Sequence, residues 1–157
     1  MPFPYYFPIT FSAEEYTDLQ ASLITALYNW LRQDDTLLGL MGTFALYLVW
    51  AKTDAALPYL VHRLDLRTGD IWPERKGTYT LDIWSYSPSA TEITAIRKRL
   101  IELLDRLQFY TDEVKNVKLN LSSDGFVPSN EPEIWHYSLL FDISLWRQSE
   151  AIQIASY

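Results

Sequence analysis

The segment that most constrains the fold runs from Ile134 to Arg147, where apolar and polar residues alternate almost without interruption. Successive side chains of a β-strand point to opposite faces of the sheet, so a period of two predicts a strand with one buried face. The expected inward set is Trp135, Tyr137, Leu139, Phe141, Ile143 and Leu145, and the expected outward set includes His136, Ser138, Asp142 and Ser144. A strand of this kind requires neighbours, and it is predicted to be central in a sheet.

Other segments are predicted to supply those neighbours. Pro58–Leu66 and Thr78–Tyr86 both alternate and are typical of a hairpin, and Glu113–Leu121 is a further strand candidate. Met41–Ala51 is predicted to be the first strand, although its continuous apolarity does not exclude a helical segment.

Two connections between these strands are expected to be exposed. Arg67–Gly77 is longer than a tight turn needs and carries Ile71 and Trp72 among charges, which predicts a projecting loop with an apolar tip. Ser122–Glu133 holds acidic residues and no basic one, and it is predicted to be an acidic hairpin tip.

Two amphipathic helices are predicted from capping signals and apolar stripes. Ser12 and Glu15 have capping-box spacing, and the stripe behind them ends near Asp34. The second helix starts after Ser87-Pro88-Ser89, and its apolar stripe is Ile93, Ile96, Leu100, Leu103, Leu104 and Leu107. The order α-β-β-β-α-β-β predicts an α+β fold, with an antiparallel or mixed sheet and two helices packed on one face.

The chain is expected to hold one domain. Its 157 residues are close to the commonest domain length and are 48% apolar. Residues 1–11 combine three prolines with five aromatics and are predicted to be an extended arm. Residues 12–147 form the domain, and residues 148–157 form a C-terminal tail.

Composition excludes several function classes. A formal charge of −7 without a basic patch disfavours nucleic-acid binding. The absence of cysteine removes thiol catalysis and cysteine-based zinc sites, and it suits a reducing cytosol. No export signal is recognised, and the longest uncharged run is too short to span a bilayer, so no membrane association is expected.

Catalytic motifs are absent from the sequence as well. No nucleophile elbow, zinc-protease or nucleotide-binding pattern occurs. His62 and His136 lie within strand patterns without ligands at metal spacing, so structural roles are expected. Asp82 and Asp142 could face each other as an acid and base pair, but surface positions are favoured. We therefore expect no enzyme activity, no cofactor and no metal.

Aromatic residues outside the expected core point to protein contacts instead. If the alternation is right, the outer face of the sheet carries Trp84, Tyr86 and Trp146. The complete set of candidate interface residues is Phe3, Tyr5, Tyr6, Phe7 and Phe11 of the arm, Ile71 and Trp72 of the loop, and Trp84, Tyr86 and Trp146 of the sheet. A small acidic domain with several such surfaces is typical of an oligomer subunit.

Four segments resemble the tail terminator, or tail-completion, proteins of long-tailed phages. They are Leu27–Gly42, Leu57–Asp65, Gly77–Asp105 and Glu133–Arg147, and the resemblance covers roughly residues 13–147. Its most distinctive features are Pro58-Tyr59 after an alanine-rich turn and Trp84-Ser85 running into a helix. The aromatic arm is not a feature of that family.

The resemblance implies a structural virion protein. Its members form a ring, typically a hexamer, that caps the tail tube and provides the surface joining it to the head. The implied partners are copies of this chain, a tail tube protein and a neck or head-completion protein, and the implied location is the virion, after assembly in the host cytoplasm. DNA would pass through an acidic lumen without specific binding. Two alternatives stay open: another neck component of similar fold, or a small-ligand carrier or enzyme with an aromatic pocket.

Overall fold

The computed structural model describes residues 18–68, 74–112 and 114–147. The elements in chain order are α2 (Leu19–Arg32), α3 (Asp35–Met41), β1 (Leu46–Leu48), β2 (Tyr59–Thr68), β3 (Glu74–Tyr86), α4 (Thr91–Leu104), β4 (Gln108–Phe109), β5 (Val114–Val127) and β6 (Ile134–Arg147). The strands form one six-stranded sheet in the order β1-β2-β3-β6-β5-β4. Only the β1–β2 pair is parallel among the described strands, so the predicted α+β class with a mixed sheet is confirmed.

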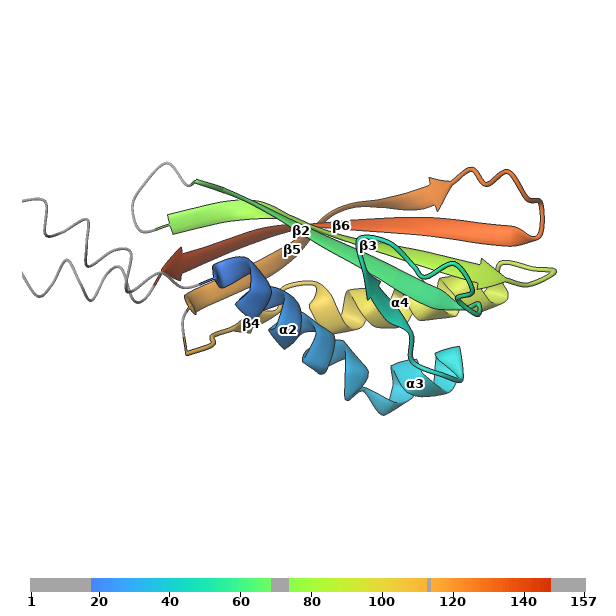
Figure 1. Ribbon diagram of the computed structural model, residues 1–157, viewed down its shortest axis with the longest axis horizontal. Helices are drawn as coiled ribbons and strands as arrows, with labels where there is room; N and C mark the ends of the chain where they lie inside the picture. Colours follow the sequence, from blue (N-terminus) through green and yellow to red (C-terminus); the bar gives the residue numbers. More distant parts are fainter. Residues whose placement is uncertain (1–17, 69–73, 113, 148–157) are drawn as a thin grey trace, which may run out of the picture.

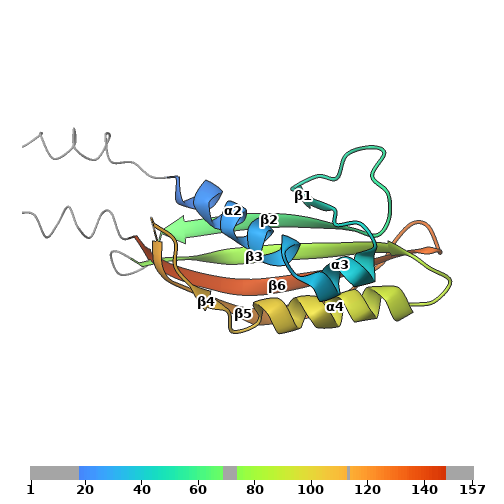
Figure 2. The ribbon, with the colours of Figure 1, turned by 90° about the horizontal axis from the view of Figure 1, so that it is seen from below.

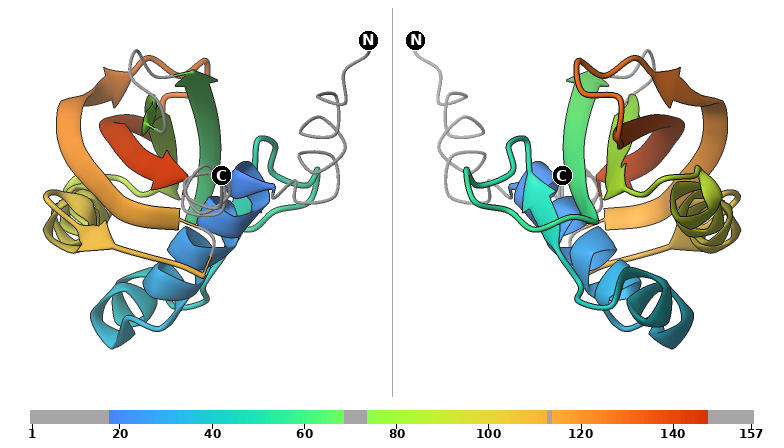
Figure 3. Two further views of the ribbon diagram at one scale, coloured as in Figure 1. Left: turned by 90° about the vertical axis from the view of Figure 1, so that its left-hand side faces the viewer. Right: turned by 90° about the vertical axis from the view of Figure 1, so that its right-hand side faces the viewer.

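The helices cover one face of this sheet (Figure 1). The same layering is visible from below, where α2, α3 and α4 all lie in front of the strands (Figure 2). The sheet is strongly twisted and curved, and the helices lie below the strands in both end-on views (Figure 3). β6 lies between β3 and β5 and is a central strand, as predicted.

The core forms where the helical stripes meet the inner face of the sheet. Its fully buried members are leucines, isoleucines and valines from the helices and the sheet, joined by Tyr79 and Phe141. They include Leu23, Leu27, Leu31, Leu81, Leu139, Ile93, Ile96, Leu100, Leu104, Val114 and Val117. Burying one such apolar side chain stabilises the folded state by about 1.5–3 kcal/mol. The predicted inward set of β6 is confirmed, with Trp135 only partly buried.

The segment after α2 differs from the prediction of a strand over Met41–Ala51. Asp34 accepts a hydrogen bond from the backbone amide of Leu37 at 2.8 Å and so caps a second helix, α3. This helix stops at Gly42, whose φ of 80° favours glycine. β1 therefore keeps only three residues of the predicted strand, and its apolar neighbours Val49 and Trp50 lie outside the sheet.

The two predicted loops are largely strand. Arg67–Gly77 was predicted to project, but β2 and β3 stay paired to the Thr68–Arg75 position. This pairing requires glycine at position 77, because a Cβ at that position would lie 2.0 Å from the carbonyl oxygen of Asp65. Ile71 and Trp72 lie outside the described residues. Ser122–Glu133 is likewise not all loop, since β5 continues to Val127 through a register shift between Leu121 and Ser123.

Candidate protein-binding surfaces

The helix-free face of the sheet carries a row of aromatic rings across four strands. Tyr47 of β1 packs edge-on against Tyr59 of β2, with ring centroids 5.9 Å apart. Tyr59 stacks on Trp84 of β3 at 6.2 Å, and Trp84 stacks on His136 of β6 at 3.8 Å. Strand pairing explains the row, since Trp84 stands opposite both Tyr59 and His136. We call these four residues the aromatic row.

A polar cluster adjoins this row. The carboxylate Oδ1 of Asp82 lies 3.2 Å from Nε2 of His136, and this nitrogen has no geometrically aligned hydrogen-bond partner. Burial favours the neutral acid, but the contacts with His136 and Ser138 prevail and lower the pKa of Asp82.

The other titratable residues singled out in the sequence lie apart. Asp142 pairs with Thr78, four positions along β3 from Asp82, which is about 13 Å at 3.3 Å per residue. His62 is in the core, where its Nδ1 lies 2.7 Å from the hydroxyl of Tyr79. In residues 18–68, 74–112 and 114–147, no group of three or more His, Asp or Glu is arranged to hold a metal ion.

The described candidate interface residues all lie on the outer face. Trp84 is half-buried within the aromatic row, whereas Tyr86 is 56% exposed and donates a hydrogen bond to Glu133. Trp146 is 49% exposed at the opposite end of the sheet, beside Glu74. The arm residues Phe3, Tyr5, Tyr6, Phe7 and Phe11 lie outside the described part of the chain, as do Ile71 and Trp72.

A groove opens beside the aromatic row and is named the outer groove. Its volume is about 450 Å³. Its lining includes the aromatic rings of Tyr59 and Trp84 and residues of the β5–β6 connection. The complete lining is Ala55, Leu57, Tyr59, Trp84, Pro128, Ser129, Asn130, Glu131 and Ile134.

The most exposed aromatic side chain in the described residues was missed by sequence reasoning. Trp50 is 83% exposed, and Leu48 and Val49 before it are 55% and 44% exposed. The three form an apolar ridge at the β1 edge of the sheet, defined as Leu48–Trp50. All three residues were predicted to lie in a strand, but Val49 turns out of the strand at a φ of 66°. No sequence signal distinguished this exposed run from a buried one.

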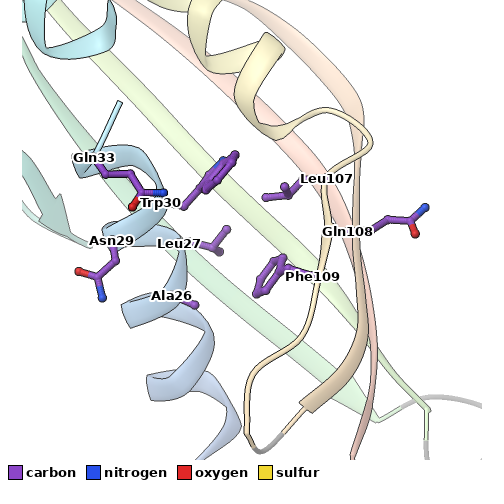
Figure 4. A pocket seen from close by; sticks show the side chains of 8 residues that line it. All are labelled: Ala26, Leu27, Asn29, Trp30, Gln33, Leu107, Gln108 and Phe109. Carbon is purple, nitrogen blue, oxygen red and sulfur yellow. The ribbon is translucent and has the colours of Figure 1, made fainter. Parts of the chain in front are cut away.

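A second cavity lies on the helical side, between α2 and the β4 segment. Leu27 and Trp30 point towards Leu107 and Phe109, whereas Gln108 points away (Figure 4). The cavity measures about 310 Å³ and has no charged residue in its lining. The Trp30 indole donates a hydrogen bond to the carbonyl of Leu103 at 3.0 Å, which ties α2 to α4 above the cavity.

Comparisons with known proteins establish a likeness of fold. No family model and no curated protein matches the sequence. The structure resembles a chain from the virion of a native gene transfer agent particle, with a TM-score of 0.68 at 15% identity, covering 83% of this chain and 99% of that chain. It also resembles a protein without a functional name, with a TM-score of 0.61 at 12% identity, covering 83% of this chain and 98% of the other. This chain therefore shares a complete domain fold with a virion component.

The helices add one negative finding. None of those in the described ranges is long and apolar enough to cross a membrane.

Proposed function

We propose that this chain is a structural protein of a phage-like virion, and that it acts as a ring-forming tail terminator or tail-completion protein. The observation that carries the proposal is the likeness to a gene transfer agent virion chain over 99% of that chain's length. The ring would cap the tail tube and join it to a neck or head-completion protein. In this role the chain needs protein contacts and no catalytic group.

The exposed apolar surfaces support an assembled state. Trp50, Tyr86 and Trp146 are each about half exposed or more, and they lie on different parts of the surface. Monomeric proteins rarely leave several large apolar side chains in water, since such surfaces favour association. The formal charge of −7 suits a ring through whose lumen DNA passes without binding.

The oligomeric state provides the first test. Light scattering and native mass spectrometry of the full chain should give a closed ring, with six copies as the expected number. Dilution should yield the monomer without intermediate aggregates, because a ring closes through one repeated contact. A chain that stays monomeric at every concentration would contradict the proposal.

The position in the particle provides the second test. Virions assembled without this protein should carry tails of uncontrolled length or fail to join heads to tails. Adding the purified chain should restore joined particles, and gold-labelled protein should map to the head-proximal end of the tail. Labelling only at the head portal would favour the alternative, another neck component of the same fold.

A small-ligand carrier is the second candidate, and the cavity in Figure 4 favours it. A volume of about 310 Å³ with an uncharged lining is near the lower end for small-molecule sites. Native mass spectrometry would reveal a co-purified apolar ligand as added mass. A monomer that keeps such a mass, and loses it in an Ala26→Trp variant, would support the carrier.

A further inference from the structure

The outer groove has the composition of a site for proline-rich peptide. Tyr59, Trp84 and Pro128 provide flat apolar surfaces, and Ser129 and Asn130 provide hydrogen-bonding groups beside them. Proline-rich segments in polyproline II conformation bind grooves of this kind, where rings contact the prolines and polar side chains contact the exposed backbone carbonyls. The groove is thus suited to an extended, uncharged segment.

The chain itself contains a segment of that chemistry. Residues 2–11, with the sequence PFPYYFPITF, hold three prolines and five aromatics, and they carry no charged side chain. Among the groove residues only Glu131 is charged, and it lies exposed at the rim. An uncharged peptide can therefore enter without leaving an ion unpaired.

The groove and the start of α2 lie at opposite ends of the sheet and on opposite faces. α2 begins beside the end of β6, whereas the groove is formed where β2 begins and β3 ends (Figure 2). The β2 edge between them is closed, since Val49 and Ala45 bond its backbone and Gln20 donates to the carbonyl of Leu64. Asp18 is therefore separated from the groove of its own chain by the sheet and by much of the sheet's length, which favours the arm of a second copy as the occupant.

We propose that the arm of one copy, residues 2–11, binds in the outer groove of a second copy. This inference rests on the proposed ring function and adds one contact between neighbouring subunits. Because the arm and the groove are different surfaces, the contact is heterologous, and repeating it closes a ring when the rotation between copies permits. Each subunit would then hold one neighbour and be held by the other.

Disulfide trapping tests the contact directly, because the chain has no cysteine of its own. One variant carries Ile9→Cys, which leaves all five arm aromatics intact. A second carries Ser129→Cys in the groove. Controls carry Asn120→Cys on the same outer face and Ala26→Cys in the cavity between α2 and β4. Full-length variants are mixed in pairs under mild oxidation, and cross-linked dimers are measured on non-reducing gels.

The Ile9→Cys and Ser129→Cys pair should cross-link roughly tenfold faster or more than the Asn120→Cys control pair, since binding raises the local thiol concentration towards millimolar. Adding Ala55→Trp to the groove variant should reduce the rate to the control level. A cross-linking rate for Ser129→Cys equal to that for Asn120→Cys would overturn the proposal. Faster cross-linking of Ile9→Cys to Ala26→Cys than to Ser129→Cys would overturn it as well.

A chain carrying both Ile9→Cys and Ser129→Cys distinguishes the two possible sources of the arm. Its cross-links should join different chains, and mostly internal closure would overturn the proposal. The oligomeric state is measured on the same samples. Rings that form without groove cross-links would refute only the arm contact, whereas monomers at every concentration would refute the ring function itself.

Discussion

Gly77 lies at a position of the β2–β3 hairpin that leaves no room for a side chain. It stands opposite Leu66, and a Cβ at this position would lie 2.0 Å from the backbone oxygen of Asp65. Backbone atoms of a central strand pair cannot withdraw as a flexible side chain can. Because Gly77 has no side chain, β2 and β3 can approach each other closely here and remain paired as far as Thr68 and Arg75.

Gly77→Ala should therefore destabilise the protein, by at least about 1–3 kcal/mol, because the added methyl group overpacks the strand pair. The matched control is Gly125→Ala in β5, where no atom lies within 4 Å of the added Cβ. Urea denaturation, monitored by tryptophan fluorescence, measures the unfolding midpoint of each variant. Equal midpoints for the two variants would show that the hairpin accommodates the methyl group.

His62 is a buried imidazole whose charge state bears on stability. Its side chain lies in the core beside Tyr79, and burial lowers the pKa of His62 to about 4. In the unfolded chain the pKa returns to about 6.5. Between these values the unfolded state binds more protons, so stability is complete above pH 6.5 and falls as the pH is lowered towards 4.

The free energy of unfolding should accordingly fall by about 2 kcal/mol between pH 7 and pH 5. Denaturant titrations at a series of pH values measure how the free energy of unfolding changes with pH. His62→Asn should be less stable at pH 7 and should show a flatter dependence of stability on pH. A wild-type profile that is flat from pH 7 to pH 5 would contradict burial of a neutral His62.

At the scale of elements, the β5–β6 hairpin is fixed to α4 by one polar cluster. Asp124 accepts hydrogen bonds from the Arg97 guanidinium at 2.6 and 2.9 Å and from the Tyr137 hydroxyl at 2.5 Å. The hydroxyl of Tyr137 and then the guanidinium of Arg97 lower the pKa of the Asp124 carboxyl. The register shift after Leu121 makes the contact possible, because it turns Asp124 towards the helical layer opposite Leu139.

Arg97→Ala should loosen this end of the hairpin while leaving the rest of the sheet intact. The free energy that holds this end of the hairpin closed should fall by about 1 kcal/mol, because the Arg97–Asp124 ion pair is partly exposed. Hydrogen exchange should report faster amide exchange in residues 123–127 and 136–140 only. The control is Lys98→Ala on the exposed face of α4. Uniform acceleration across all strands would mean that Arg97 supports the whole fold and not this hairpin.

Periodic elements were predictable from the sequence, and elements set by single backbone positions were not. β6 and α4 were predicted because each repeats its apolar spacing over 14 residues. The β-bulge in β5 was not, since Ser122 to Gly125 has the composition of an ordinary turn. The same holds for the surfaces: alternation placed Trp84, Tyr86 and Trp146 on the outer face, but the apolar ridge depends on the φ angle of Val49.

At the scale of the whole molecule, apolar surface is distributed over several separate regions. The apolar ridge lies at the β1 edge, Tyr110 is 80% exposed near the β4 edge, and Trp146 lies on the outer face. The two edges of one sheet thus both present apolar side chains. A subunit with different apolar surfaces on opposite edges is suited to head-to-tail contacts, which is the arrangement that a ring requires.

Trp50 is the side chain on which such a contact should depend most. Truncating an indole that is buried at the centre of an interface typically reduces the binding free energy by about 2 kcal/mol or more. This loss corresponds to roughly a 30-fold weaker association. Trp50→Ser should therefore shift assembly to higher concentration without changing the unfolding midpoint of the monomer, since the side chain is 83% exposed. Trp50→Phe is the matched control and should retain most of the affinity, because it keeps an aromatic ring at the same position. Light scattering over a dilution series measures the assembly, and circular dichroism on the same samples measures the fold. If Trp50→Ser and Trp50→Phe assemble at the wild-type concentration, the apolar ridge is not a subunit contact, and the tail tube or neck partner becomes the remaining candidate for covering it.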